Sequence, residues 1–442
     1  MKFDLIIKDV NILSNGEPLK KNYSIGIKNN LIIKVKPSKN FDLDVAKATL
    51  LGKSAICMPG FINNHNHSPI MSVRGMVEDL GFAPAYTPNV PQGHWISEEE
   101  TFLLSRLGLA EMLISGCTTV VDFYAKPFAL IKATKEIGLR TFVGGRIMDV
   151  DTLKLSGGEF SYSKKLGNQT FNDNVSLIEK YHNQEDTLIK CVLGPHAADT
   201  CSYDLLKQVA EYGHKHKLLI HTHLSQSKME VNRVKQIYNK TPTELLNDAG
   251  ILSSKTILAH CIFLDKQEIA IIAKSKSYVS HVPSGNATGG MIAPIKDLLD
   301  ASIPISIATD TKSADMFEAM RNAIRVARIK NNGKFIFDAK TLFNWATVNG
   351  ARSLGIEKKV GKIEEGKIAD IIILNEKAPN LRPVVDGYGI VVHSGSGQNV
   401  RDVILNGEII VQNYNPLKFN LQEIINDAQK VCDRLWKKAG HQ

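Results

Sequence analysis

The middle of the chain alternates short apolar runs with segments of helical periodicity, and this alternation restricts the fold more than any other feature. The apolar, β-branched runs cover residues 58–64, 118–123, 141–145, 188–194, 218–223, 256–261, 278–282 and 305–310. Such runs are typical of strands buried on both faces. Successive parallel strands need a crossover connection, which is commonly a helix. Eight strands with intervening helices over about 300 residues match a (β/α)8 barrel of the TIM type. An open doubly wound sheet is the alternative, but no glycine-rich dinucleotide loop follows the first run.

The two ends of the chain show a different pattern, in which short runs are separated by turn residues. Strands are predicted over residues 3–7, 23–27 and 31–35, and again over 370–374 and 403–411, where Asn406-Gly407 is a hairpin signal. We expect these segments to form one small β-sandwich. The predicted domains are 1–58 and 362–415 for the two parts of the sandwich, 59–361 for the barrel, and 416–442 for a C-terminal helical tail.

Composition argues against several classes of protein. The six cysteines form no CxxC pair, which disfavours a disulfide framework or a cysteine-built zinc finger. The net charge of +9 comes largely from lysines spread among acidic residues, so no nucleic-acid partner is indicated. No apolar stretch approaches the roughly 20 residues of a membrane helix, and residues 1–10 lack the apolar core of a signal peptide. We expect a cytoplasmic protein with no membrane partner.

Histidine and aspartate side chains stand at the ends of four predicted strands. His65 and His67 follow the first run, His223 and His260 end two later ones, and Asp310 ends the last. Residues two apart on a strand point to the same face, so the imidazoles of His65 and His67 can reach one ion. The C-terminal ends of barrel strands meet at the mouth where active sites form. We therefore expect these side chains to converge.

This set of side chains suits a particular kind of metal. Imidazole and carboxylate ligands without a thiolate favour zinc, or Fe(II) and other first-row ions. A site with few protein ligands leaves a position for water, whose pKa the metal lowers to roughly 7. Asp310 could then take a proton from that water and deliver it to a leaving group. Each feature alone is weak, because a strand-end aspartate is more often a helix cap. Together, in barrel order, they predict a metal-dependent hydrolase.

With these residues, the chain resembles the amidohydrolase superfamily, in the branch of cytosine-, guanine- and adenosine-type deaminases and triazine hydrolases. The similarity includes residues 59–67, 116–122, 195–196, 308–310, 345–355, 361–370 and 400–407, and the segments around His223 and His260. It implies a barrel flanked by a composite β-sandwich, a small-molecule substrate and a homo-oligomer. It also implies one divalent ion, zinc or alternatively Fe(II), because no fourth-strand lysine is placed to bridge two ions.

The resemblance assigns roles to individual residues. The residues that match the family's metal ligands are His65, His67, His223 and Asp310. The residues predicted to take part in catalysis are Asp310, His260 and Gln226. The residues predicted to contact the substrate are His196, Gln226, His260, Asn286 and Arg74.

Three departures from the family pattern bear on the substrate. Gln226 stands where the deaminases carry a glutamate that shuttles protons, and an amide can only donate and accept hydrogen bonds. Ala287 stands where the adenosine-type enzymes have a lysine, and the loop after Asp310 is short. All three positions lie where a substrate would be held. They favour a small heterocycle or another compact amine or amide over a nucleoside.

The predicted function is therefore hydrolysis of a C–N bond, by deamination or amine release, in a small nitrogen-rich heterocycle such as a triazine, pyrimidine or purine. Two alternatives remain open. A hydrolytic dehalogenase or cyclic amidase would need no ring protonation, which Gln226 would tolerate. A catalytically inactive metal-binding scaffold would also explain Gln226, although it would not need His260 and Asp310.

Overall fold

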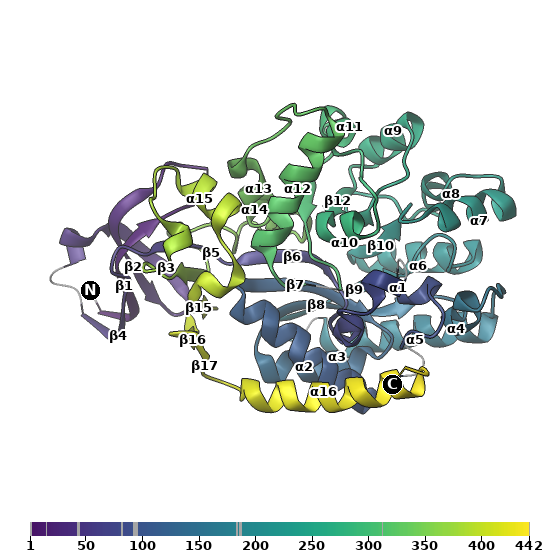
Figure 1. The fold of residues 1–442 in the computed structure, drawn as a ribbon, viewed down its shortest axis with the longest axis horizontal. Coiled ribbons are helices and arrows are strands. Elements are labelled where there is room, and N and C mark those ends of the chain that lie inside the picture. Colours follow the sequence, from purple (N-terminus) through teal and green to yellow (C-terminus); the bar gives the residue numbers. More distant parts are fainter. Residues whose placement is uncertain are drawn as a thin grey trace.

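The computed structural model describes residues 2–14, 16–41, 45–80, 83–91, 96–182, 184, 188–311 and 313–441. These residues build an eight-stranded parallel sheet surrounded by helices and a separate nine-stranded sheet. The two parts lie side by side along the longest axis of the molecule, with the nine-stranded sheet beside the N-terminus (Figure 1).

The eight-stranded sheet is a (β/α)8 barrel, as the sequence predicts. Its strands lie in sequence order, and the last strand also contacts the first. They are β6 (Phe61–Asn66), β7 (Cys117–Tyr124), β8 (Arg140–Ile147), β9 (Ile189–Pro195), β10 (Ile220–Leu224), β11 (Thr256–His260), β12 (Tyr278–His281) and β13 (Ile305–Ile307).

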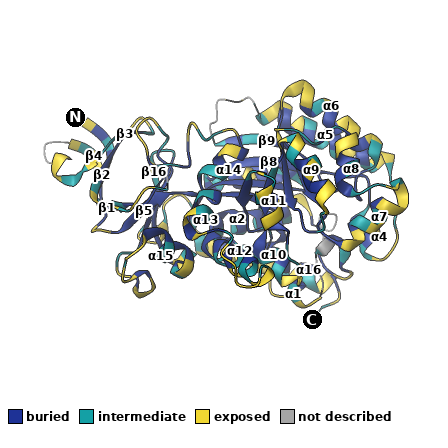
Figure 2. Cartoon of the chain, turned by 90° about the horizontal axis from the view of Figure 1, so that it is seen from above, coloured by how far each residue is buried: buried dark blue, intermediate teal, exposed yellow. Residues whose placement is uncertain are grey.

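Helices and short helical turns follow the barrel strands, and most of them surround the barrel. They are η2 (Ser68–Val73), α1 (Val77–Leu80), η3 (Pro84–Tyr86), α2 (Glu98–Ile114), α3 (Pro127–Ile137), α4 (Thr152–Ser156), α5 (Lys164–Tyr181), α6 (Tyr203–His216), α7 (Lys228–Tyr238), α8 (Pro242–Asp248), α9 (Lys266–Ser275), α10 (Pro283–Thr288), α11 (Ile295–Asp300), α12 (Met316–Lys330), α13 (Ala339–Trp345) and α14 (Val348–Ser353). Buried residues concentrate in the strands and on the inner sides of these helices (Figure 2).

The helix predicted over residues 97–116 illustrates why these segments form as they do. The Ser97 hydroxyl accepts a hydrogen bond from the Glu100 N–H, and the Glu100 carboxylate accepts one from the Ser97 N–H, so the capping box satisfies two free N–H groups. At the other end, Gly116 adopts a φ of +97°, which a side chain would strain. The next residue begins β7, all of whose residues are buried.

The nine-stranded sheet joins the two ends of the chain. Its strands are β1 (Lys2–Ile12), β2 (Lys20–Lys28), β3 (Leu31–Pro37), β4 (Val45–Leu51), β5 (Ile56–Pro59), β14 (Ile371–Leu374), β15 (Val400–Leu405), β16 (Glu408–Gln412) and β17 (Asn415–Pro416). The N- and C-terminal halves meet where β5 pairs with β14. The predicted hairpin is present between β15 and β16, with positive φ at Asn406 and Gly407.

The run over residues 58–64, expected as one barrel strand, is divided between the two sheets at Gly60. Up to Pro59 the chain pairs with β14, and the Gly60 N–H still donates to Asp370. The Phe61 N–H donates instead to Gly116, immediately before β7. A Cβ atom at Gly60 would lie 2.2 Å from the Thr118 side chain, so glycine permits the close passage from one sheet to the other.

The remaining short elements are η1 (Ser38–Phe41), η4 (Pro379–Leu381), α15 (Gly387–Ser394) and η5 (Gly397–Asn399). The predicted C-terminal helix is α16 (Leu421–Lys438), which runs along α2 (Figure 1). It buries Ala428, Val431 and Leu435 and donates a hydrogen bond from Trp436 to the carbonyl of Ser72. Within the described residues, no helix combines the length and apolar character that crossing a membrane requires.

Candidate active site

The His65-Asn-His67 segment ends strand β6 at the C-terminal mouth of the barrel. His67 Nδ1 lies 2.7 Å from the carbonyl oxygen of Phe123, which can only accept a hydrogen bond, so Nδ1 carries the proton and Nε2 presents a lone pair. His65 is fully buried, and neither of its ring nitrogens has a hydrogen-bond partner among the described residues. Both histidines therefore have a ring nitrogen available for a ligand.

The segment after His67 is fixed from the neighbouring strand. The buried carboxylate of Asp122, on β7, accepts hydrogen bonds from the Asn66 side chain at 2.8 Å and from the backbone and hydroxyl of Ser68. These contacts hold the residues on both sides of His67. Burial raises the pKa of Asp122, and the hydrogen bonds partly oppose that shift.

His223 approaches the same point from strand β10. Its Nδ1 lies 2.5 Å from the carbonyl oxygen of His196, so its Nε2 also presents a lone pair. Its Nε2 lies 3.2 Å from that of His67. His221, two residues earlier, points its Nε2 at the carbonyl oxygen of Asn64, at 2.8 Å.

Asp310 and His260 complete the group. One carboxylate oxygen of Asp310 lies 3.7 Å from His65 Nε2 and 3.9 Å from His67 Nε2, and the other lies 3.9 Å from His260 Nε2. His260 Nδ1 is 2.9 Å from the side-chain oxygen of Asn286, which orients the ring. Asp310 and His260 have φ values of +62° and +71°, a left-handed conformation that is rare without glycine and recurs at functional sites.

The residues present fit a metal ion. The ligand atoms of His65, His67 and His223 lie within 4.8 Å of one another, as do those of His65, His260 and Asp310. Burial, followed by the neighbouring histidines, lowers the pKa of His65 and His223 well below the usual range, and burial lowers the pKa of His67 to about 3. The imidazoles are therefore neutral at pH 7, the form that binds metals. Nitrogen and oxygen donors without thiolate suit zinc or iron.

A pocket opens directly over these groups. It is lined by His67, Ile70, Ala83, Ala85, Tyr86, Tyr124, Arg146, His196, His223, Gln226, His260, Gly285, Asp310 and Thr311. His196 is held in its wall by a 2.7 Å hydrogen bond between Nδ1 and the Thr200 hydroxyl. A metal site at the base of a partly apolar pocket is the usual arrangement for a small-molecule enzyme.

Gln226 is held in the pocket wall by a buried carboxylate. The backbone N–H groups of Ser225 and Gln226 donate to the two oxygens of Glu230, at 3.0 and 2.7 Å. Ser227 caps helix α7 by accepting from the Glu230 backbone. Burial raises the pKa of Glu230. These hydrogen bonds fix the turn between β10 and α7, and Gln226 is 4% exposed.

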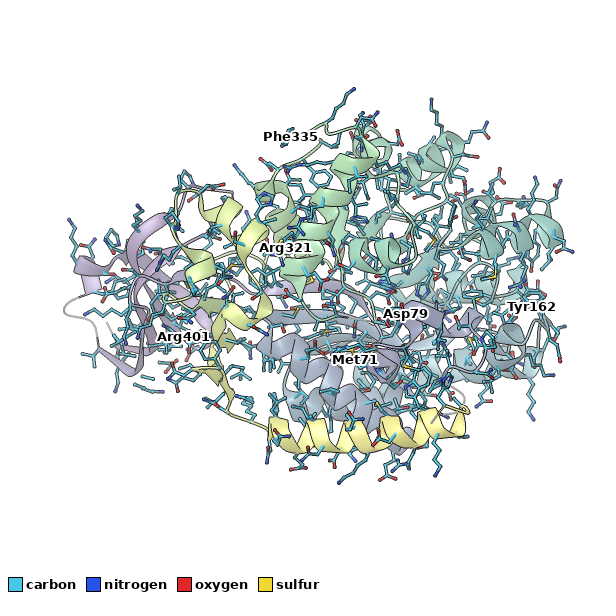
Figure 3. The ribbon with its side chains drawn as sticks, in the orientation of Figure 1. Met71, Asp79, Tyr162, Arg321, Phe335 and Arg401 are labelled. Carbon is cyan, nitrogen blue, oxygen red and sulfur yellow. The ribbon has the colours of Figure 1, made fainter. Side chains whose placement is uncertain are left out.

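The structure brings most of the predicted site residues together, but not Arg74. Arg74 forms an ion pair with Glu111 and lines a neighbouring polar pocket with Glu78, on the segment after β6 that also carries Met71 and Asp79 (Figure 3). This second pocket adjoins the first at Gly285, which lines both. Asn286 is buried and contacts His260 through its side-chain oxygen. Substrate contacts by Arg74 and Asn286 remain predictions.

Arg146, Tyr124 and Tyr86 also line the pocket, although the sequence analysis did not predict them. Arg146 is the penultimate residue of strand β8, and its guanidinium lies 4.6 Å from the centre of the ring of Tyr124, the last residue of β7. The rule applied to His223 and Asp310, that polar residues at strand ends face the mouth, would have found Arg146 as well. Tyr86 lies in η3 and donates to Asp199. Its irregular segment offers no periodic pattern from which to place it.

Comparison with known proteins places the chain in a family. Residues 56–410 match the amidohydrolase family. A 5'-deoxyadenosine deaminase of Methanosphaera stadtmanae is 31% identical over 98% of this chain and 99% of its own length. A 5-methylthioadenosine/S-adenosylhomocysteine deaminase of Thermococcus onnurineus is 32% identical over 87% of this chain and 88% of its own.

Solved structures share the fold. An adenosine deaminase from Xanthomonas campestris with bound zinc has a TM-score of 0.88 at 24% identity, with 99% of both chains covered. An atrazine chlorohydrolase from Arthrobacter aurescens, complexed with zinc, has a TM-score of 0.84 at 22% identity, with 97% of this chain and 100% of that chain covered.

Proposed function

The chain belongs to the amidohydrolase family and is a hydrolase of carbon–nitrogen bonds, and we propose that it removes an amino group from a purine-type heterocycle as ammonia. We further propose that one zinc ion is held by His65, His67, His223 and Asp310. Fe(II) is the alternative, since the same donors accept it.

One observation carries the metal assignment. His67 and His223 are neutral and carry their protons on Nδ1, so two nitrogen lone pairs face each other 3.2 Å apart. Two lone pairs repel at this distance unless a cation lies between them. A zinc ion bound here would act as a Lewis acid and lower the pKa of a water molecule to about 7.

The protein side chains supply the remaining chemistry. Asp310 accepts a proton from the attacking water and passes it to the departing nitrogen. His260, oriented by Asn286, is placed to hydrogen-bond the group on the attacked carbon. The buried pocket limits competing water, which strengthens each of these contacts.

The substrate class rests on the relatives, which are named as deaminases of adenosine derivatives. They favour a nucleoside, whereas Gln226, Ala287 and the short loop after Asp310 favour a more compact ring. Purine bases and nucleosides should therefore be tested together.

The direct experiment is to measure ammonia release from purine bases, purine nucleosides, aminopyrimidines and aminotriazines by the zinc-loaded protein. At least one purine should be turned over, and Asp310→Asn should lose that activity. Lys132→Gln, on the outside of α3, is a control that should keep it. No ammonia from any compound would contradict the proposal.

Gln226 favours a second candidate, hydrolysis of a halide or cyclic amide, because neither needs a proton on a ring nitrogen. Release of halide or a ring-opened acid without ammonia would identify it. A cytoplasmic location and a homo-oligomeric state remain predictions that cell fractionation and light scattering can test.

A further inference from the structure

We infer that the pocket selects amino heterocycles that carry a conjugated ring carbonyl, with Gln226 and Arg146 as the residues that determine this specificity. The inference rests on the proposed deaminase function and narrows its substrate class. It follows from the hydrogen-bond donors that the pocket offers.

Gln226 supplies the first donor. Its side-chain nitrogen Nε2 is buried and has no hydrogen-bond partner among the residues that the structure describes. The side chain lines the pocket, and Glu230 fixes its backbone. A buried donor without a partner is unfavourable, so a bound ligand with an acceptor at this place is favoured.

Arg146, on strand β8, supplies further donors to the same pocket. Arg146 is 7% exposed, and its Nε and Nη2 atoms also have no hydrogen-bond partner within the described part of the chain. The Tyr124 ring beneath the guanidinium holds it in place. The pocket therefore presents a fixed positive charge in a place that water reaches poorly.

The pocket wall contains few groups that could act as a general acid. Among the described residues that line the pocket, Asp310 is the one carboxylic acid. Tyr86 already donates its hydroxyl proton to Asp199, at 3.2 Å from both carboxylate oxygens. The pocket can thus stabilise a developing negative charge by donors and a cation, but Gln226 cannot transfer a proton to a ring nitrogen.

This distribution of donors matches one reaction course. Water adds to the carbon that bears the amino group, and its proton passes to Asp310. The electron pair of the C=N bond moves through the ring onto the conjugated carbonyl oxygen, which accepts hydrogen bonds from Gln226 and Arg146. Asp310 then gives the proton to the amino nitrogen, the C–N bond breaks, the C=N bond re-forms, and ammonia leaves. No ring nitrogen needs protonation.

A ring without a carbonyl must hold that electron pair on a ring nitrogen, where a proton is needed. General acid catalysis is worth about 10²–10⁴-fold, so we expect at least about a 100-fold difference in kcat/KM between the two classes. The matched probes are guanine against 2-aminopurine, and isocytosine against 2-aminopyrimidine, with adenosine as a further ring that lacks a carbonyl.

The experiment measures kcat/KM for these probes with the zinc-loaded wild type and the Gln226→Glu variant. The wild type should favour guanine and isocytosine, and Gln226→Glu should raise kcat/KM for 2-aminopurine or adenosine by about 100-fold. Arg146→Lys should lower kcat for the carbonyl-bearing ring more than Arg434→Met, an exposed control on α16. Circular dichroism and zinc content should show that each variant is folded and loaded.

Equal kcat/KM for rings with and without a carbonyl would overturn the inference and leave the deaminase function standing. So would a Gln226→Glu variant whose preference is unchanged. Absence of ammonia from every probe would contradict both the inference and the proposed function.

Discussion

The Nε2 atoms of His67 and His223 lie 3.2 Å apart, although 156 positions separate the two residues in the chain. Two nitrogen ligands of a tetrahedral zinc ion, each bound at about 2.0–2.1 Å, stand about 3.3 Å apart. The spacing of the two imidazoles is thus that of neighbouring ligands on one ion. Strands β6 and β10, on different sides of the barrel, set this spacing.

Replacing either histidine by alanine should weaken zinc binding by more than the 10–100-fold typical of residues that only support a ligand. The change removes one direct ligand of the ion and leaves the other histidine to bind it with one nitrogen fewer. Competition with a coloured chelator measures the affinity. His182→Gln, on a histidine outside the site, serves as the control and should bind zinc like the wild type. Unaltered zinc affinity in His67→Ala would show that this nitrogen is not a ligand.

Asp310→Asn should lower kcat by about 10²–10⁴-fold, because an amide cannot carry the proton from water to the leaving group. The asparagine keeps an oxygen near His65 and His260, so the variant should still take up zinc. Steady-state kinetics on protein of known zinc content separates the two effects. A variant with full zinc and near wild-type kcat would rule out the proton-transfer role.

Asp122→Asn should weaken zinc binding by about 10–100-fold without unfolding the protein. Asp122 holds Asn66 and the Ser68 backbone, and so fixes the segment that carries His67. The same chelator competition gives the affinity, and circular dichroism reports the fold. If zinc binds with wild-type affinity, the segment is positioned by other contacts.

His182 should make stability depend on pH. Burial lowers its pKa, and the hydrogen bond between its Nδ1 and the Cys191 carbonyl oxygen, at 3.1 Å, opposes that shift only in part. At low pH the unfolded chain binds a proton that the folded chain resists, so this contribution is complete above about pH 6.5 and is lost as the pH falls. Urea unfolding at pH 7.5 and 5.5 should show a smaller loss on acidification for His182→Gln. An identical loss in both proteins would exclude the effect.

The barrel could be predicted because its strands are buried on both faces, so their positions are visible as continuous apolar runs. The division at Gly60 could not be predicted, because the apolar run over residues 58–64 is unbroken in sequence. Only the change of pairing partner from β14 to β7 separates the two strands. β4 was missed for a related reason. Most of its residues are exposed or half-buried, and its pattern is correspondingly weak.

The same distinction applies to the site. Residue type and strand position were enough to predict that four side chains lie close together, because the C-terminal ends of barrel strands meet at one mouth. They are His65, His67, His223 and Asp310. Arg74 could not be placed, because its partner, Glu111, comes from the packing of α2 against the segment after β6.

The most direct test of a zinc-dependent deaminase is a titration of the metal-free protein with zinc while ammonia release from a turned-over purine is followed. Turnover should be absent without metal, rise linearly, and stop rising at one zinc ion per chain. Full ammonia release by metal-free protein would contradict a zinc-dependent reaction, and a break at two ions per chain would contradict the single site formed by His65, His67, His223 and Asp310.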